Sequence, residues 1–169
     1  MQKWLWLVLA LGATVAIIAI LWAFLRTDTD SVALSYPGGV ELAGPIRGGR
    51  GVCPILQWVA DPADPKPCPV VLHLPKGDLG GDALCDADGP AAAERLGGPA
   101  ELDIFPLHKQ GKVVGVRVSV LPGGSPVEVS VAGKRLSLPV SEEDVVRLLG
   151  DPSRRVEYDP TGRPRQEGK

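Results

Sequence analysis

The feature that most constrains this chain is an uncharged apolar run from Trp4 to Leu25. As a helix rising ~1.5 Å per residue, the run is long enough to cross the ~30 Å hydrocarbon layer of a membrane. A lone segment in lipid has to be helical, because only a helix hydrogen-bonds its own backbone. Lys3 and Arg26 bracket the run. The run therefore predicts a transmembrane anchor over residues 1–26.

A cleaved signal peptide is the alternative for this segment. Such a peptide has an apolar core of ~7–15 residues and a cleavage site with small side chains. The run found here is longer, and it ends in bulky side chains. The first cysteine is Cys53, far from the end of the run, which disfavours lipoprotein processing. We expect an uncleaved anchor.

The basic groups beside the run predict its orientation. The positive-inside rule counts Lys and Arg near the ends of a membrane span. Lys3 and the terminal amine precede the run, and Arg26 alone follows it closely. We therefore expect a single-pass protein of the cytoplasmic (inner) membrane, with its C-terminal domain outside the cytoplasm. Membrane lipid is then one partner, through the N-terminal helix.

The remaining residues are numerous enough for one domain with its own core, predicted over residues 27–158. A disordered polar tail is expected over residues 159–169. The chain has 18 Lys and Arg and 20 Asp and Glu, so removing Lys3 and Arg26 leaves 16 against 20, a net charge of −4. This mild balance predicts no nucleic-acid partner. The 21 glycines and 17 prolines favour short strands joined by turns.

Alternating apolar residues predict the strands of the domain. Val116, Val118 and Val120 alternate with smaller or polar residues, so one face of that strand should be buried. The fold class predicted is α+β: one N-terminal transmembrane helix, then a mainly antiparallel β-rich domain with two short helices. A flexible loop is expected over 44–51, and strands over 32–36, 40–42, 52–60, 70–74, 102–108, 113–121, 127–131, 135–138 and 155–158.

Two segments share a plan in which a short helix ends at Leu-Gly-x-Pro. Glycine accepts the left-handed conformation at a helix end, and proline prevents the helix from continuing. Ser141 begins the second helix as a capping residue, with an acid three positions later. Either a true repeat or a common solution for ending helices explains the likeness. The residues of the motif are Leu96, Gly97, Pro99, Leu149, Gly150 and Pro152.

The segment that runs from Ser141 through Gly150 to Arg154 resembles the helix-turn segment of the small outer-membrane lipoproteins that assist barrel assembly. It is also similar to β-lactamase-inhibitor-like domains, which have the same helix-then-strands plan. The resemblance covers roughly residues 91–120 and 141–158. It implies a small extracytoplasmic binding or assembly module without catalytic residues. The chain differs from the lipoproteins by lacking a lipid-acceptor cysteine.

The chain has three cysteines, all after the anchor. Outside the cytoplasm two of them are expected to form a disulfide. A Cys53–Cys68 disulfide is favoured, because both cysteines lie beside prolines in a turn-rich segment. A Cys68–Cys85 disulfide is the alternative pairing. The alternative is that all three are reduced and pack as small apolar residues.

The remaining polar residues predict neither a cofactor nor a metal. The aspartates over 78–89 lack the closing glutamate of a calcium loop and are expected in a solvated turn. His73 lies between apolar neighbours and has no close-set zinc ligands, so an ordinary strand histidine is expected. His73 and His108 are the two histidines, and neither stands in a known nucleophile motif. We expect no enzymatic activity.

Two functions are compatible with these observations. The first is a membrane-anchored extracytoplasmic interaction or envelope-assembly module, which binds an envelope protein through its sheet or a hairpin edge. The second is an immunity-type or inhibitor protein that occludes a toxin or hydrolase. In that case the acidic residues over 78–88 would face a basic cleft.

Overall fold

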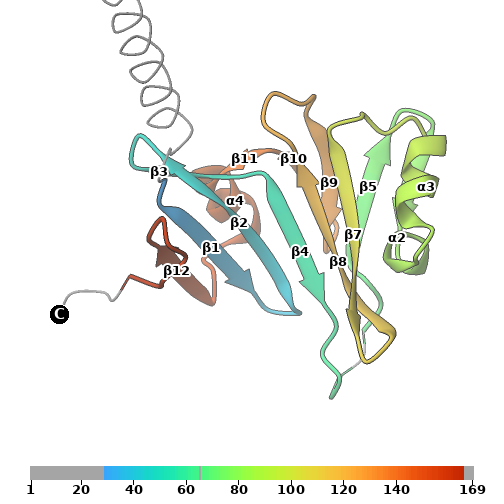
Figure 1. Cartoon of the computed structure of the whole chain (residues 1–169), viewed down its shortest axis with the longest axis horizontal. Coiled ribbons are helices and arrows are strands. Elements are labelled where there is room, and N and C mark those ends of the chain that lie inside the picture. The colour runs from blue at the N-terminus through green and yellow to red at the C-terminus, as the bar shows by residue number, and fades with distance from the viewer. Residues whose placement is uncertain (1–28, 65, 166–169) are drawn as a thin grey trace, which may run out of the picture.

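The computed structural model describes residues 29–64 and 66–165, which form two antiparallel sheets and three short helices (Figure 1). The larger sheet contains β1 (Ser31–Tyr36), β2 (Val40–Arg47), β3 (Arg50–Cys53), β4 (Ile55–Val59), β7 (Leu102–Lys109), β8 (Lys112–Val120), β11 (Val140–Ser141) and β12 (Arg154–Tyr158). The smaller sheet contains β5 (Val70–Leu74), β6 (Gly77–Gly80), β9 (Val127–Val131) and β10 (Lys134–Leu138). The helices are α2 (Asp82–Cys85), α3 (Gly89–Arg95) and α4 (Glu142–Leu149).

The strand β2 connects the parts of the larger sheet. Its first half pairs with β1 on one side and β4 on the other, and its last residues pair with β3. The sheet continues through β4 to β8 and β7, through β1 to β12, and through β3 to β11. The smaller sheet has the order β10-β9-β5-β6.

One hydrophobic core joins the two sheets, because the inward side chains of both belong to a single buried cluster. In β8 the expected alternation is confirmed: Val116, Val118 and Val120 are buried, whereas Arg117 between them is exposed. Leu72 of β5 is fully buried. Truncating such a leucine to alanine typically costs ~2–5 kcal/mol, so burial of Leu72 in this core stabilises the domain.

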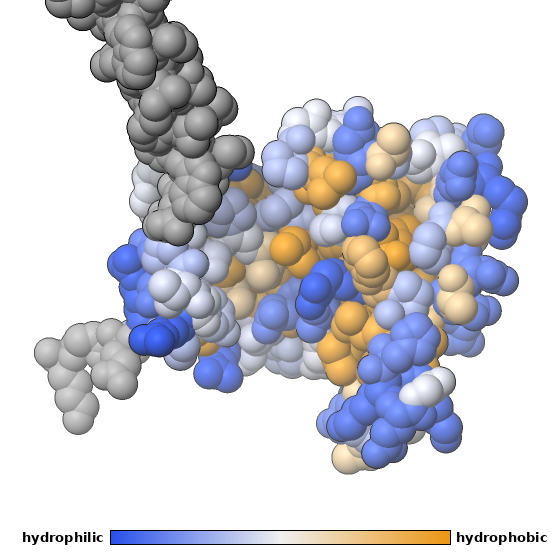
Figure 2. All heavy atoms as spheres, viewed as in Figure 1, coloured by the Kyte–Doolittle hydropathy of each residue, from blue (hydrophilic) through white to orange (hydrophobic). Residues whose placement is uncertain are grey.

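The helices lie at opposite ends of the molecule, with α4 beside β1 and β3 and with α2 and α3 at the far side of the smaller sheet (Figure 1). Apolar side chains also reach the surface, and Figure 2 shows them gathered over β4, β7 and β8. The large apolar residues exposed there are Val59, Phe105, Val113 and Leu121.

The predicted fold class is wrong as stated. The described residues form two β-sheets with three helices in place of two, because the acidic stretch supplies α2 as well as a strand, β6. No helix within residues 29–64 and 66–165 has the length and apolar character needed to span a membrane. The predicted transmembrane segment from Trp4 to Leu25 lies outside the described residues.

The glycine-rich segment over 44–51, predicted as a flexible loop, is a hairpin. Gly48 and Gly49 both have positive φ, of 58° and 77°. Two successive positive φ angles match the twist of a tight hairpin turn, which joins antiparallel strands directly. Arg47 and Arg50 are therefore paired across β2 and β3. The turn chemistry is visible in the sequence, but the strand ends that flank the turn are rich in glycine, proline and arginine and lack the apolar alternation that predicts a strand.

The chain after β12 folds back along that strand. The Asp159 carboxylate accepts hydrogen bonds from the backbone N–H of Thr161 (2.8 Å) and of Arg163 (2.9 Å). Arg165 then reaches Asp30 with an ion-pair distance of 2.7 Å. The first part of the segment predicted as a polar tail is thus a hydrogen-bonded turn that returns to the start of β1.

Candidate functional site

An apolar pocket of about 480 Å³ opens between the two sheets. The turn after β1, the segment before β5, the turn between β9 and β10 and the end of α4 each supply part of its wall. Proteins commonly place ligand sites in pockets of ~300–1,000 Å³ that are apolar with few polar groups. The described lining residues are Tyr36, Pro37, Gly38, Val40, Trp58, Lys66, Pro67, Cys68, Pro69, Val131, Ala132, Lys134 and Leu149.

Two aromatic side chains form the floor of this pocket, and strand register brings them together. Val40 of β2 pairs with Tyr36 on one side and Trp58 on the other. The Tyr36 hydroxyl donates to the Gly150 carbonyl (3.2 Å), and the Trp58 indole N–H donates to the Gly38 carbonyl (3.0 Å). Both polar atoms are therefore satisfied by the protein, and the rings are held as apolar walls.

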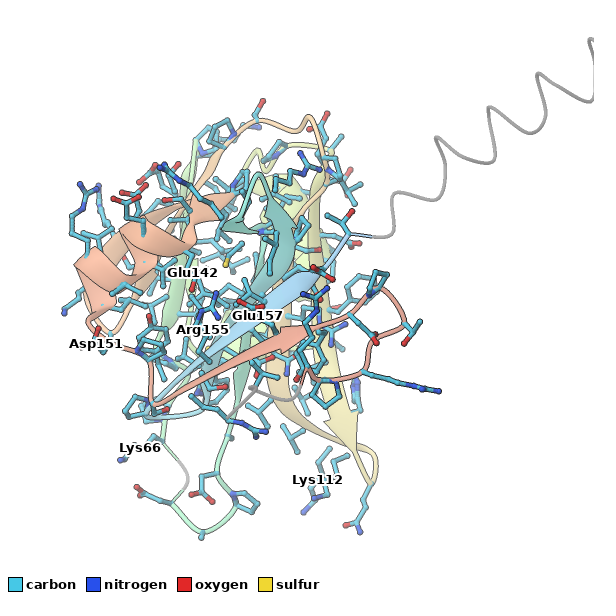
Figure 3. The ribbon with its side chains drawn as sticks, turned by 90° about the vertical axis from the view of Figure 1, so that its left-hand side faces the viewer. Lys66, Lys112, Glu142, Asp151, Arg155 and Glu157 are labelled. Atoms are coloured by element: carbon cyan, nitrogen blue, oxygen red, sulfur yellow. The ribbon has the colours of Figure 1, made fainter. Side chains whose placement is uncertain are left out.

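The charges at the pocket are basic. Lys66 and Lys134 are the charged side chains among the described lining residues, and both are exposed. Lys66 also forms an ion pair with Asp64 (2.8 Å). Figure 3 shows Lys66 at the lower end of the molecule, well away from Glu142 and Arg155. An apolar pocket with ammonium groups at its rim fits an apolar group that carries an acid.

The three cysteines are free thiols, and the structure does not bring the predicted pair together. Cys53 lies in β3 opposite Val140, whereas the Cys68 side chain is hydrogen-bonded to Cys85. That hydrogen bond lowers the pKa of Cys68 and, together with burial, raises the pKa of Cys85. The main cause of the raised pKa of Cys85 is the contact with Cys68.

Of the two Leu-Gly-x-Pro segments, the second one contributes to the pocket. Leu149 lines it, and the Gly150 carbonyl holds Tyr36. Gly97 ends α3 with a φ of 80°, and Leu96 and Pro99 lie outside this pocket. Among the described residues, no group of three His, Cys, Asp or Glu side chains could hold a metal ion.

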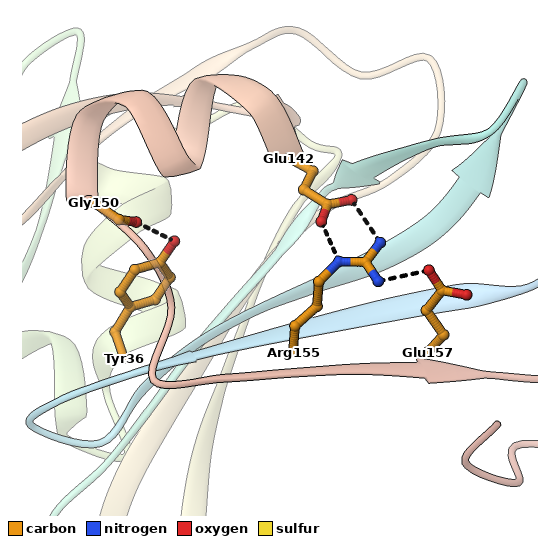
Figure 4. A network of polar contacts seen from close by, with 5 residues as sticks. All are labelled: Tyr36, Glu142, Gly150, Arg155 and Glu157. Carbon is orange, nitrogen blue, oxygen red and sulfur yellow. Dashed lines mark hydrogen bonds and ion pairs between the residues drawn. The ribbon is translucent and has the colours of Figure 1, made fainter. Parts of the chain in front are cut away.

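A charged network at the start of α4 fastens this helix to β12 (Figure 4). The Arg155 guanidinium donates to both Glu142 oxygens (2.5 and 3.3 Å) and to Glu157 (2.6 Å). The hydrogen bonds with Glu142, followed by those with Glu157, raise the pKa of Arg155. Its contacts hold the helix whose last residues form the pocket wall, so the network is structural.

Sequence reasoning missed a second polar arrangement. His73, predicted as an ordinary strand histidine, contacts Asp78 and Ser130 on the outer face of the smaller sheet. Asp78 is near His73 in the chain, but Ser130 is 57 residues away, and only the pairing of β5 with β9 brings it there.

Comparison of the chain with protein-family models, with curated proteins and with solved structures gave no match. The resemblance to the outer-membrane lipoproteins and inhibitor-like domains therefore stays a prediction from the helix-turn segments.

Proposed function

We propose that this domain is an extracytoplasmic protein-interaction module that binds an apolar, acid-bearing segment of an envelope protein. The observation that carries the proposal is the pocket of about 480 Å³, which has Tyr36 and Trp58 in its wall and lysines at its rim. Protein interfaces concentrate binding energy where one partner's apolar anchor fills such a desolvated pocket. Burying one large apolar side chain contributes ~1.5–3 kcal/mol.

The proposed location rests on the sequence, through the apolar run from Trp4 to Leu25 and the flanking Lys3. A reporter fused after Lys169 should be active as alkaline phosphatase, which needs an oxidising compartment. Activity of a cytoplasmic reporter alone would reverse the orientation. An intact mass that lacks the first twenty or so residues would replace the anchor with a cleaved signal.

The pocket is tested by photo-cross-linking in intact cells. A photoreactive residue at Ala132, in the pocket wall, should give one discrete cross-linked partner, and the same residue at Lys112, in the β7–β8 hairpin and outside the pocket wall, should not. The double change Lys66→Glu with Lys134→Glu should abolish the adduct if the partner's acid matters. Equal adducts from Ala132 and Lys112, or an adduct indifferent to the lysines, would contradict the proposal.

A second function, inhibition of a basic enzyme, is favoured by a different surface. The aspartates of the acidic stretch, Asp78, Asp82, Asp86 and Asp88, are all exposed, as an acidic contact surface requires. Changing Asp86 and Asp88 together to asparagine separates the two proposals. If the domain is the interaction module, this change should leave the Ala132 adduct intact. If the domain is an inhibitor of a basic enzyme, the change should abolish partner binding.

A further inference from the structure

The outer face of the smaller sheet carries a hydrogen-bonded series of Asp78, His73 and Ser130 from three neighbouring strands. The distance from His73 Nδ1 to Asp78 Oδ1 is 2.8 Å, and the distance from His73 Nε2 to Ser130 Oγ is 2.7 Å. These are the lengths at which a base takes a proton from a nucleophile and is itself oriented by a third group.

The chemistry of the partners decides the direction of both hydrogen bonds. An ionised carboxylate only accepts, so the hydrogen on His73 Nδ1 points to Asp78. In neutral imidazole the other nitrogen, Nε2, then has a free lone pair and accepts the Ser130 O–H. The tautomer that Asp78 selects is therefore the one in which His73 can act as a base toward Ser130.

Strand register holds these three residues in place. His73 of β5 pairs with Asp78 of β6 on one side and with Glu128 of β9 on the other. Ser130 follows Glu128 by two positions in β9 and so faces the same side of the sheet. The neighbouring residues Leu72 and Val129 point inward and are buried. The His73 side chain is only 18% exposed, which limits its movement away from Ser130.

A cation lies beside Ser130, and a hollow begins at that cation. Arg135 of β10 is the cross-strand partner of Ser130 and is exposed on the same face. A hollow of about 510 Å³ begins at Glu128 and Arg135 and extends to Leu148 of α4. Because β9 lies between β5 and β10, its backbone N–H groups serve the two ladders. Stabilisation of a developing oxyanion therefore has to come from a side chain, and Arg135 is placed for it.

We propose that Ser130 is a nucleophile that accepts an acyl group from a carboxylic ester that binds beside Arg135, at the edge of this hollow. Ser130 Oγ bonds to the carbonyl carbon while its proton passes to His73 Nε2, and Asp78 stabilises the imidazolium. The oxyanion forms beside Arg135 and collapses, the bond to the alcohol breaks, and the alcohol leaves with the proton from Nε2. The products are acyl-Ser130 and a free alcohol, and water attack on the acyl group regenerates Ser130. This activity uses residues separate from the apolar pocket and does not depend on the interaction proposed there.

A fluorophosphonate tests the proposal on the full chain in detergent. Its phosphorus takes the place of the carbonyl carbon, fluoride leaves, and the adduct is located by peptide mass spectrometry. We expect the adduct on Ser130. His73→Gln should lower the labelling rate about 100-fold, within the usual range for a general base. Asp78→Asn and Arg135→Gln should lower it less.

Ser119 is the matched control, because it also lies within a strand, in β8 opposite Asp103, and does not line the hollow. Ser119→Ala should leave the rate unchanged, and Ser130→Ala should remove the adduct. Melting temperatures of all variants show whether the sheet is intact. No adduct on Ser130, labelling of Ser119 at the same rate, or a folded His73→Gln variant that reacts as fast as the parent chain would overturn the proposal.

Discussion

The two ends of the molecule each carry a helix that stops at Leu-Gly-x-Pro, yet the two helices are held differently. At one end, α4 is fastened by side chains: Ser141 caps its start, and Glu142 forms an ion pair with Arg155. At the other end, α3 is tied at its end by the backbone, since the N–H of Lys76 donates to the carbonyl of Leu96 (3.0 Å). In the described part of the chain, neither α2 nor α3 has a side-chain cap at its start.

The side chains at the α4 end stabilise the fold, whereas those at the α2 and α3 end include groups that can react. Beside α4 the Arg155 guanidinium is bound by two carboxylates, those of Glu142 and Glu157. Around α2 the specific side-chain contact is between two thiols, Cys68 and Cys85, which can still react. Both helices end at the Leu-Gly-x-Pro sequence, but the side chains that contact them differ. Four predictions test this contrast, from the largest expected effect to the smallest.

The largest expected effect on stability comes from Cys68 and Cys85, at the end of the molecule that carries α2 and α3. In an oxidising compartment, exchange with a disulfide donor should join Cys68 to Cys85 and leave Cys53 free. Closing a loop of about this length stabilises a fold by ~3 kcal/mol. Non-reducing peptide mapping, with thiols blocked at lysis, identifies the pair, and urea unfolding with and without reductant measures the effect. A Cys53–Cys68 bridge would contradict the contact seen in the structure, and three free thiols would remove the contrast.

Gly150→Val should destabilise the α4 end by ~2 kcal/mol, within the range for backbone held in a sparsely populated region. Gly150 has φ 91° and ψ −173°, a conformation essentially restricted to glycine. A Cβ there would meet nothing within 4 Å, so the cost is conformational. The control is Arg154→Val, an exposed change in β12. Equal urea midpoints for the two variants would mean that α4 does not end in this conformation.

Alanine substitutions at the N-cap positions of α4 and α3 compare how much each cap stabilises its helix. Ser141→Ala should cost ~1 kcal/mol, because the Ser141 hydroxyl accepts a hydrogen bond from the Asp144 N–H (3.1 Å). Asp88→Ala, at the corresponding position of α3, should cost much less, since its side chain makes no such bond. Equal losses in urea unfolding would show that both helices depend on caps alike.

The alkaline loss of stability at the α4 end is the smallest of the four effects when it is measured between pH 8 and pH 9. Burial, and then the charge of Glu142, raise the pKa of Cys53 from 9.0 to about 12. Burial, followed by Cys53 and nearby acids, raises the pKa of Tyr36 from 10.0 to about 12. The unfolded chain therefore loses these protons first. Stability that is complete below pH 9 falls as pH rises toward 12.

Cys53→Ala and Tyr36→Phe should each flatten that pH dependence, whatever they do to stability at pH 8. The measurement is the urea midpoint as a function of pH. Cys68 and Cys85 do not titrate once they are oxidised to a disulfide, so they should contribute nothing to the pH dependence of stability. A slope unchanged in both variants would place its origin elsewhere.

The sequence by itself determined the local elements. The strand from Val127 to Val131 is β9, the apolar alternation of Val116 and Val118 marks the buried face of β8, and Ser141 begins α4 where its cap chemistry requires. These features depend on residues a few positions apart, whose spacing is visible in the chain. The hairpin at Gly48 was missed because the strand ends beside its turn are rich in glycine, proline and arginine and lack apolar alternation.

Only the tertiary structure decided which distant side chains meet. Ser130 lies beside His73 because β9 pairs with β5 in one register, and Tyr36 reaches Gly150 across 114 residues because α4 packs next to β1. A shift of one residue in the pairing of β9 with β5 would turn Ser130 to the other face of the sheet. That register is set by burial of all the strands together in one core, which no local stretch of sequence specifies.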